Sequence, residues 1–274
     1  MATGRTAVYL FCFARENLLP DVEVLEKDTR NPESGLSVLA ADGIAAVYTM
    51  VPLDDFTGPE AESRLQDLDW IGPRAVFHER VIEEAAMHSP VYPVGFGTIY
   101  LTLNNLQKVM QKFRESIADF LENAAGKNEW AVKGYADKTK AAEVLMKHLA
   151  EEKRGKPASP GARYLFEQRL RTTIFEKLET RLGETLSEAK RKLLPMSFDF
   201  RERQPLPGAA TEEEAEMICN WAFLVRKPDE PRFETAIQAL NDLYRDKGIF
   251  FRISGPWPPF SFAPSLAADS EAAT

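Results

Sequence analysis

The chain has 274 residues, of which 44% are hydrophobic and 28% are charged, and its formal net charge is −8. This length allows one large domain or two ordinary ones, and two is the better expectation. The composition is typical of a globular protein and argues against a fibrous or wholly disordered chain. The acidic balance argues against a nucleic-acid partner, because phosphate contacts need a basic face.

The number and setting of the cysteines, and the lengths of the apolar runs, indicate the cellular compartment in which the protein is expected. The two cysteines, Cys12 and Cys219, lie in apolar, strand-like stretches where a free thiol behaves as a small hydrophobic side chain. No basic region, apolar run and cleavage site combine at the N-terminus, and no apolar run approaches the length of a membrane span. We therefore expect a reduced, cytoplasmic protein without a membrane span.

The N-terminal third begins with strand signals. Residues 6–14 are almost continuously apolar, which predicts a strand covered on both faces. Residues 35–51 carry two apolar runs around Asp42-Gly43, a dipeptide favoured in tight turns, and predict a hairpin. The intervening residues 15–34 are charged and lack a period, so we expect a loop with a short helix.

Helical and extended segments follow in alternation. Residues 72–89 open with Gly-Pro and predict a helix; residues 90–101 predict an extended segment; and residues 103–121 carry an amphipathic stripe. A strand at residues 128–136 closes this half. Helices segregated against a mostly antiparallel sheet predict an α+β domain over residues 1–136 that approximates a ferredoxin-like unit.

The second half opens with helices and then returns to the α+β pattern. A helix over residues 137–152 and a long amphipathic helix from Pro160 to Leu193 predict a helical hairpin. The remaining predictions are strands at 196–201, 216–227 and 249–255, with a helix between the last two that starts at Pro231 and ends at Gly248. The two halves could be distant structural repeats, and residues 263–274 predict a disordered tail.

The histidines and cysteines form no catalytic constellation. His78 and His88 lie roughly 80° apart around the predicted helix and about 15 Å along it, so they cannot share a metal ion. Glu84 and His88 are spaced to offer two ligands, but no second pair has ligand spacing. His148 borders a packing face, and neither cysteine has a neighbouring base. We predict no metal, no cofactor and no catalytic residue.

Two further motifs favour structural interpretations. "GFGT" at residues 95–98 lacks the third glycine of a dinucleotide fingerprint and the Lys-Ser/Thr ending of a phosphate loop, so its glycines more simply let the backbone turn. The acidic run "TEEEAE" at residues 211–216 is typical of a solvated loop rather than of an acid/base pair.

The segment "GPWPPFSF" at residues 255–262 needs an explanation of its own. Its three prolines fix φ and remove backbone donors, so we expect extended chain outside the interior of a sheet. Trp257, Phe260 and Phe262 then need burial from another source. Two interpretations remain: the aromatic side chains fold back over the protein's own surface as a strap between domains, or they contact a partner.

Three stretches together resemble one family. Residues 76–100 are similar to the His-x-x-Val helix and the Pro-Val-x-Pro-x-x-Phe-Gly-Thr segment of gas vesicle proteins of the GvpF/GvpL family. "PGARYL" at residues 160–165 resembles the start of that family's long helix. "GPWPPFSF" resembles its Gly-Pro-Trp-Pro-Pro-Tyr-x-Phe ending, with Phe260 in place of the usual tyrosine. The order and the distances agree, so the resemblance covers residues 6–262.

The resemblance implies a non-enzymatic accessory protein that acts with the small hydrophobic shell subunit, GvpA, and other accessory proteins. It also implies a ferredoxin-like N-terminal domain and, over residues 137–262, a modified ferredoxin-like domain with added helices. Val94-Gly95 departs from the family, which usually has a basic or polar residue there. If the loop with Pro93 and Phe96 contacts a partner, this departure would alter the contact. The alternative function is a module that binds a small metabolite between sheet and helix.

Overall fold

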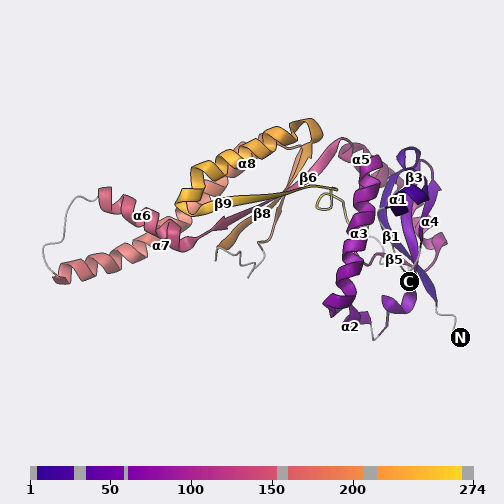
Figure 1. The fold of residues 1–274 in the computed structure, drawn as a ribbon, viewed down its shortest axis with the longest axis horizontal. Helices are drawn as coiled ribbons and strands as arrows, with labels where there is room; N and C mark the ends of the chain where they lie inside the picture. The colour runs from indigo at the N-terminus through magenta and orange to yellow at the C-terminus, as the bar shows by residue number, and fades with distance from the viewer. Residues whose placement is uncertain (1–4, 28–34, 59–60, 153–159, 206–214, 267–274) are drawn as a thin grey trace. The chain divides into compact units, whose positions relative to one another are not determined.

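The computed structural model describes residues 5–27, 35–58, 61–152, 160–205 and 215–266 (Figure 1). The chain divides into two compact units, Met1–Asn128 together with Trp257–Thr274, and Glu129–Pro256. The division therefore comes earlier than the boundary predicted after Ala136, and the chain returns to the first unit at its C-terminal end. Disorder was predicted for residues 263–274, and residues 267–274 of this range lie outside the described residues.

The first unit contains a mixed set of strands and helices. Its sheet has the order β2-β3-β1-β4, with β5 also paired to β1, and all of these pairs are antiparallel. The strands are β1 (Thr6–Arg15), β2 (Leu36–Ala41), β3 (Ile44–Pro52), β4 (Val91–Pro93) and β5 (Ile99–Tyr100). The helices are α1 (Val22–Lys27), α2 (Ala61–Gln66), α3 (Leu68–His88), α4 (Leu103–Lys112) and α5 (Arg114–Ala124).

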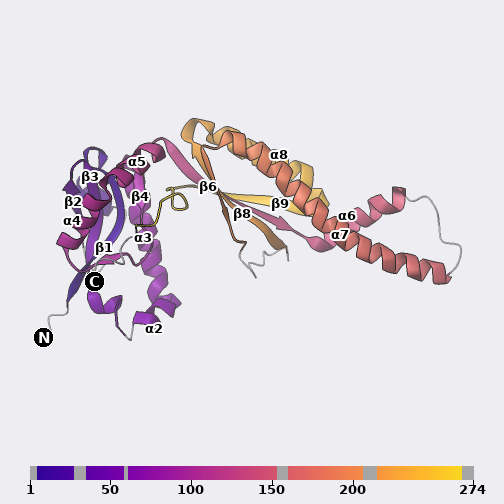
Figure 2. The same ribbon diagram turned by 180° about the vertical axis from the view of Figure 1, so that it is seen from behind.

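Strand β1 is buried on both faces, as its apolar sequence predicts. One face packs with α1 and α3 in a cluster that we call the α3-side core, which includes Phe11, Leu25, Val81 and Ile82. The other face packs with α4 and α5 in the α5-side core, which includes Leu10, Phe13, Leu106 and Ile117. Figures 1 and 2 show α3 and α4 on either side of this sheet. The sheet is therefore the middle layer of the first unit.

The hairpin prediction is confirmed. Asp42 and Gly43 have φ of 52° and 82°, the left-handed pair that joins β2 to β3 with the twist of the two strands. The helix predicted from Gly72 instead begins at Leu68, because the Asp67 side chain accepts a hydrogen bond from the Asp69 amide and caps the helix earlier. The stripe over residues 103–121 forms two helices, since Phe113 departs from helical geometry between them.

The second unit has a four-stranded sheet in the order β7-β8-β6-β9. Its strands are β6 (Lys127–Ala136), β7 (Asp199–Arg203), β8 (Glu216–Arg226) and β9 (Ile249–Trp257). Its helices are α6 (Lys138–Glu152), α7 (Pro160–Leu193) and α8 (Glu230–Tyr244). Strand β7 starts later than predicted, because the residues Leu194–Met196 form a turn of 3-10 helix. In the part of the chain that the structure describes, no helix combines the length and the apolar character needed to cross a membrane.

The prediction that residues 128–136 close the first half was wrong. Trp130 and Val132 of β6 belong to the core of the second unit, where they pack with Trp221 and Phe223 of β8. The predicted helical hairpin is confirmed over the described side chains, since Ala141 and Leu145 of α6 share this core with residues of α7 such as Leu178. Helices α6, α7 and α8 all contribute to it (Figure 2).

The second unit begins and ends on neighbouring strands. Strands β6 and β9 are adjacent in the sheet, and a Cβ on Gly255 would lie 2.9 Å from the Glu129 carbonyl oxygen. Gly255 also has φ of 138°, which other residues rarely adopt. Strand β9 runs two residues further than predicted, through Pro256 and Trp257, and as an edge strand it agrees with the expectation of extended chain outside the interior of a sheet. Pro256 is tolerated since β9 is an edge strand.

We expect Gly255→Ala and Gly183→Ala, the same change in one unit, to have opposite effects. Gly255→Ala should lower the free energy of unfolding by about 2 kcal/mol or more, through backbone strain and the clash with Glu129. Gly183 lies exposed in α7 with open space around it, so Gly183→Ala should raise it by about 1 kcal/mol. Denaturant unfolding measures both, and equal effects would contradict the close approach of β6 and β9.

Candidate functional site

The C-terminal segment packs on the first unit. Phe260 contacts the α3-side core, whereas Ala263 and Leu266 contact the α5-side core. The segment therefore touches both layers that flank the sheet. The hydroxyl of Tyr92, in edge strand β4, donates a hydrogen bond to the Pro264 carbonyl. Figures 1 and 2 show this C-terminal segment, in yellow, beside the elements of the first unit.

The three aromatic residues of the segment have different surroundings. Phe262 is buried, with 8% of its surface exposed, and its amide donates to the Pro259 carbonyl at 3.1 Å. The Phe260 amide donates to the Pro258 carbonyl at 2.7 Å, so the segment forms a compact turn. Trp257, at the end of β9, keeps 38% of its surface exposed. Phe260 and Phe262 thus have internal packing roles, and Trp257 is the one of the three that faces solvent most.

The end of β4 and the loop after it hold the other two predicted site residues, Pro93 and Phe96. Pro93 is buried and lies opposite Cys12 of β1 in the sheet. The Phe96 ring lies 6.0 Å from that of Tyr9 and 5.8 Å from that of His78. Phe96 and Phe260 both pack against the α3-side core, so the structure brings these two predicted residues to one cluster.

A buried hydrogen-bond network holds this loop. The Tyr9 hydroxyl lies 2.9 Å from His78 Nδ1, and His78 Nε2 lies 3.1 Å from the Val94 carbonyl oxygen. Because a carbonyl only accepts, Nε2 carries the proton and Nδ1 accepts from Tyr9. The Gly97 amide donates to the Tyr9 hydroxyl at 3.2 Å. One neutral histidine therefore ties α3 and β1 to both ends of the loop.

Burial changes the acid–base properties of this network. It lowers the pKa of His78 from 6.5 to about 4 and raises that of Tyr9. His78 is 4% exposed and neutral near pH 7, so it is a structural hydrogen-bonding group here. The Gly97 amide donates its hydrogen bond to Tyr9, and the Thr98 hydroxyl donates to the Gly95 carbonyl. Both groups are therefore bonded within the protein. The structural interpretation of "GFGT" fits this arrangement better than a phosphate cradle does.

The other groups with reactive chemistry are placed as follows. Burial raises the pKa of both Cys12 and Cys219 to about 12, so neither thiol is a ready nucleophile. His88 Nε2 lies 3.3 Å from Glu84 Oε1, and among the described residues no group of three or more His, Cys, Asp or Glu side chains gathers as a metal site. Most of the acidic run 211–216 lies outside the described residues, although Glu216 pairs with Lys138 at 2.7 Å.

The pairing of Tyr9 with His78 and the bond from Tyr92 to Pro264 were missed from the sequence. Tyr9 and Tyr92 each lie in an apolar run whose pattern predicts a buried strand and nothing more. A polar atom inside such a run is the available signal, since a buried hydroxyl needs a hydrogen-bond partner. The sequence does not identify that partner.

The titration of His78 predicts a pH dependence of stability. The unfolded chain binds a proton below about pH 6.5, but the folded chain does so only near pH 4. The contribution of His78 to the free energy of unfolding is therefore fully present above pH 6.5, and it falls by about 3 kcal/mol as the pH drops to 4. Denaturant unfolding of the native chain and of His78→Gln across this range tests it. Equal slopes of stability against pH in the two proteins would contradict the buried neutral state.

The chain is similar to known proteins over most of its length. The family model described as gas vesicle synthesis protein GvpL/GvpF matches residues 7–264. Gas vesicle protein L1 of Halobacterium salinarum is 27% identical over 240 residues, which cover 84% of this chain and 81% of that protein. Gas vesicle protein L of Streptomyces sp. (strain CB03234) is 23% identical over 220 residues, which cover 80% of each chain.

A solved structure has the same fold. The crystal structure of the gas vesicle protein GvpF from Anabaena sp. PCC7120 matches 95% of this chain and 99% of its own, with a TM-score of 0.67 and 19% identity. Because it covers 95% of the chain, the similarity extends over both units. Since the family model spans nearly the whole sequence, the chain belongs to the GvpL/GvpF family of gas vesicle synthesis proteins.

Proposed function

We propose that the chain is a non-enzymatic accessory protein that binds the small hydrophobic shell subunit, GvpA, and other accessory proteins in the cytoplasm during nucleation of the gas vesicle wall. Membership of the GvpL/GvpF family, over residues 7–264, is the observation that carries the proposal. The site chemistry is compatible with it. The buried histidine and both buried thiols of the described residues serve packing and hydrogen bonding.

Exposed apolar side chains supply a contact for such a partner. A strongly apolar subunit needs apolar surface on the protein that holds it in water. We propose Trp257 as a contact residue because its large ring is 38% exposed while Phe260 and Phe262, a few residues on, pack inward. Tryptophan is also one of the residue types enriched among energetically dominant interface contacts.

We further propose that both units are ferredoxin-like. The order of elements in the first unit is β1, α1, β2, β3, α3, β4, and the strand order is β2-β3-β1-β4. The second unit repeats this spatial order as β7-β8-β6-β9, with α6 and α7 after its first strand and α8 after its third. An experimental structure in which β1 pairs with β2 rather than β3 would contradict this classification.

Co-purification with the shell subunit tests the proposed function. In a pull-down with the tagged chain, Trp257→Ala should reduce the amount of shell subunit recovered about tenfold or more, as expected for a dominant interface residue. It should lower the free energy of unfolding by only about 1 kcal/mol, because the ring is not deeply buried.

Phe198→Ala is the matched control, since Phe198 is an aromatic residue of similar exposure, 46%, in the second unit. This variant should retain the subunit. If the native chain recovers no shell subunit, and a strain lacking the protein still forms vesicles, the proposed function is wrong. If Phe198→Ala and Trp257→Ala lose the subunit equally, only the assignment of Trp257 is wrong.

A further inference from the structure

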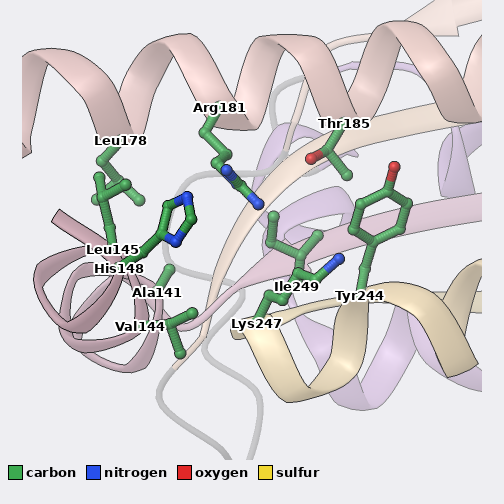
Figure 3. A pocket seen from close by; sticks show the side chains of 10 residues that line it. All are labelled: Ala141, Val144, Leu145, His148, Leu178, Arg181, Thr185, Tyr244, Lys247 and Ile249. Atoms are coloured by element: carbon green, nitrogen blue, oxygen red, sulfur yellow. The ribbon is translucent and has the colours of Figure 1, made fainter. Parts of the chain in front are cut away.

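The second unit contains a cavity of about 180 Å³ between its helices. Helices α6 and α7 form two of its walls, and the end of α8 with the turn into β9 forms the third (Figure 3). The residues that line it are Ala141, Val144, Leu145, His148, Leu178, Arg181, Thr185, Tyr244, Lys247 and Ile249. The sequence predicted a packing face beside His148, and this cavity opens in that face.

The cavity combines an apolar wall with cationic groups. Figure 3 shows Val144, Leu145, Leu178 and Ile249 around it, with the Arg181 guanidinium reaching in from α7. Lys247 approaches from the opposite side, and its Nζ lies 5.0 Å from the centre of the Tyr244 ring. Within the described part of the chain, neither Arg181 nor Lys247 forms an ion pair. The described lining of the cavity therefore includes two cationic side chains and no carboxylate.

A buried hydroxyl faces the same space. Thr185 is 4% exposed, and its hydroxyl points from α7 toward the cavity (Figure 3). It makes no hydrogen bond to another residue that the structure describes, and it is not sealed from the cavity, so a molecule there can reach it. The nearby carboxylate of Glu188 already accepts from the Tyr244 hydroxyl at 2.5 Å and from Lys192 at 2.9 Å. A bound acceptor would satisfy Thr185 and Arg181 together.

The volume limits the size of the ligand. An apolar cavity of about 150 Å³ holds a benzene molecule, which has six carbon atoms. A space of about 180 Å³ therefore admits about six carbon atoms with a small polar group. A carboxylate matches the polar end best, because it accepts hydrogen bonds from a guanidinium and from a hydroxyl but donates none.

We propose that this cavity binds a small aliphatic monocarboxylate of about six carbons, with its carboxylate on Arg181 and Thr185 and its chain against Leu145, Leu178 and Ile249. The proposal concerns only the second unit and does not depend on binding of the shell subunit. It gives a chemical form to the alternative function considered from the sequence, a module that binds a small metabolite.

Calorimetric titration of the full chain with hexanoate tests the proposal. Hexanoate should bind saturably, whereas hexanamide, which lacks the charge, and acetate, which lacks the chain, should bind about tenfold more weakly. Arg181→Gln should weaken hexanoate binding about tenfold or more, and Thr185→Val, which keeps the shape and removes the hydroxyl, should weaken it severalfold.

Arg232→Gln is the charge-matched control, because Arg232 is exposed on α8 and does not line the cavity. It should leave hexanoate binding unchanged. Thr185→Val keeps the test decisive if Arg181→Gln fails to fold. The proposal is overturned if hexanoate does not bind, if hexanamide binds as tightly, or if Arg232→Gln weakens binding as much as the cavity variants do.

Discussion

The return of the C-terminal segment to the first unit is the contact on which the rest of the arrangement depends. Phe260, Phe262 and Pro264 join a unit whose other residues end at Asn128, so the whole second unit is an insertion within the first. An inserted unit needs its two ends close together. Strands β6 and β9 meet this condition by lying side by side, and Gly255 lets their backbones approach beside Glu129.

Much of the secondary structure could be predicted from local patterns. The hairpin at Asp42-Gly43 follows from the conformations that these two residues tolerate, and the long helix α7 follows from its apolar period. Which strands pair with each other in a sheet could not be predicted in this way. Residues of β6 are apolar enough to join either sheet, and only their packing with β8 assigns them to the second. A capping side chain, Asp67, likewise outweighed the Gly-Pro signal at Gly72.

The candidate site was predictable to a lesser extent. The aromatic content of residues 255–262 predicts that some of the rings need burial, but the sequence does not distinguish Trp257, which stays exposed, from Phe262, which does not. The reason is that burial depends on the turn formed by Pro258 and Pro259, whose carbonyls accept from Phe260 and Phe262. The hydrogen bonds of His78 to Tyr9 and Val94 connect residues that are separated in the chain. The cavity beside Thr185 is likewise lined by residues from separate elements, so both features appear only with the tertiary structure.

The C-terminal segment is an integral part of the first unit, and native-state hydrogen exchange can measure this dependence. Phe262→Ala in the full chain removes a buried ring at a cost of about 3 kcal/mol. Amide exchange should become faster in β1 and β4 of the first unit and stay unchanged in β7 and β8 of the second. Equal loss of protection in both units, or none in either, would contradict it.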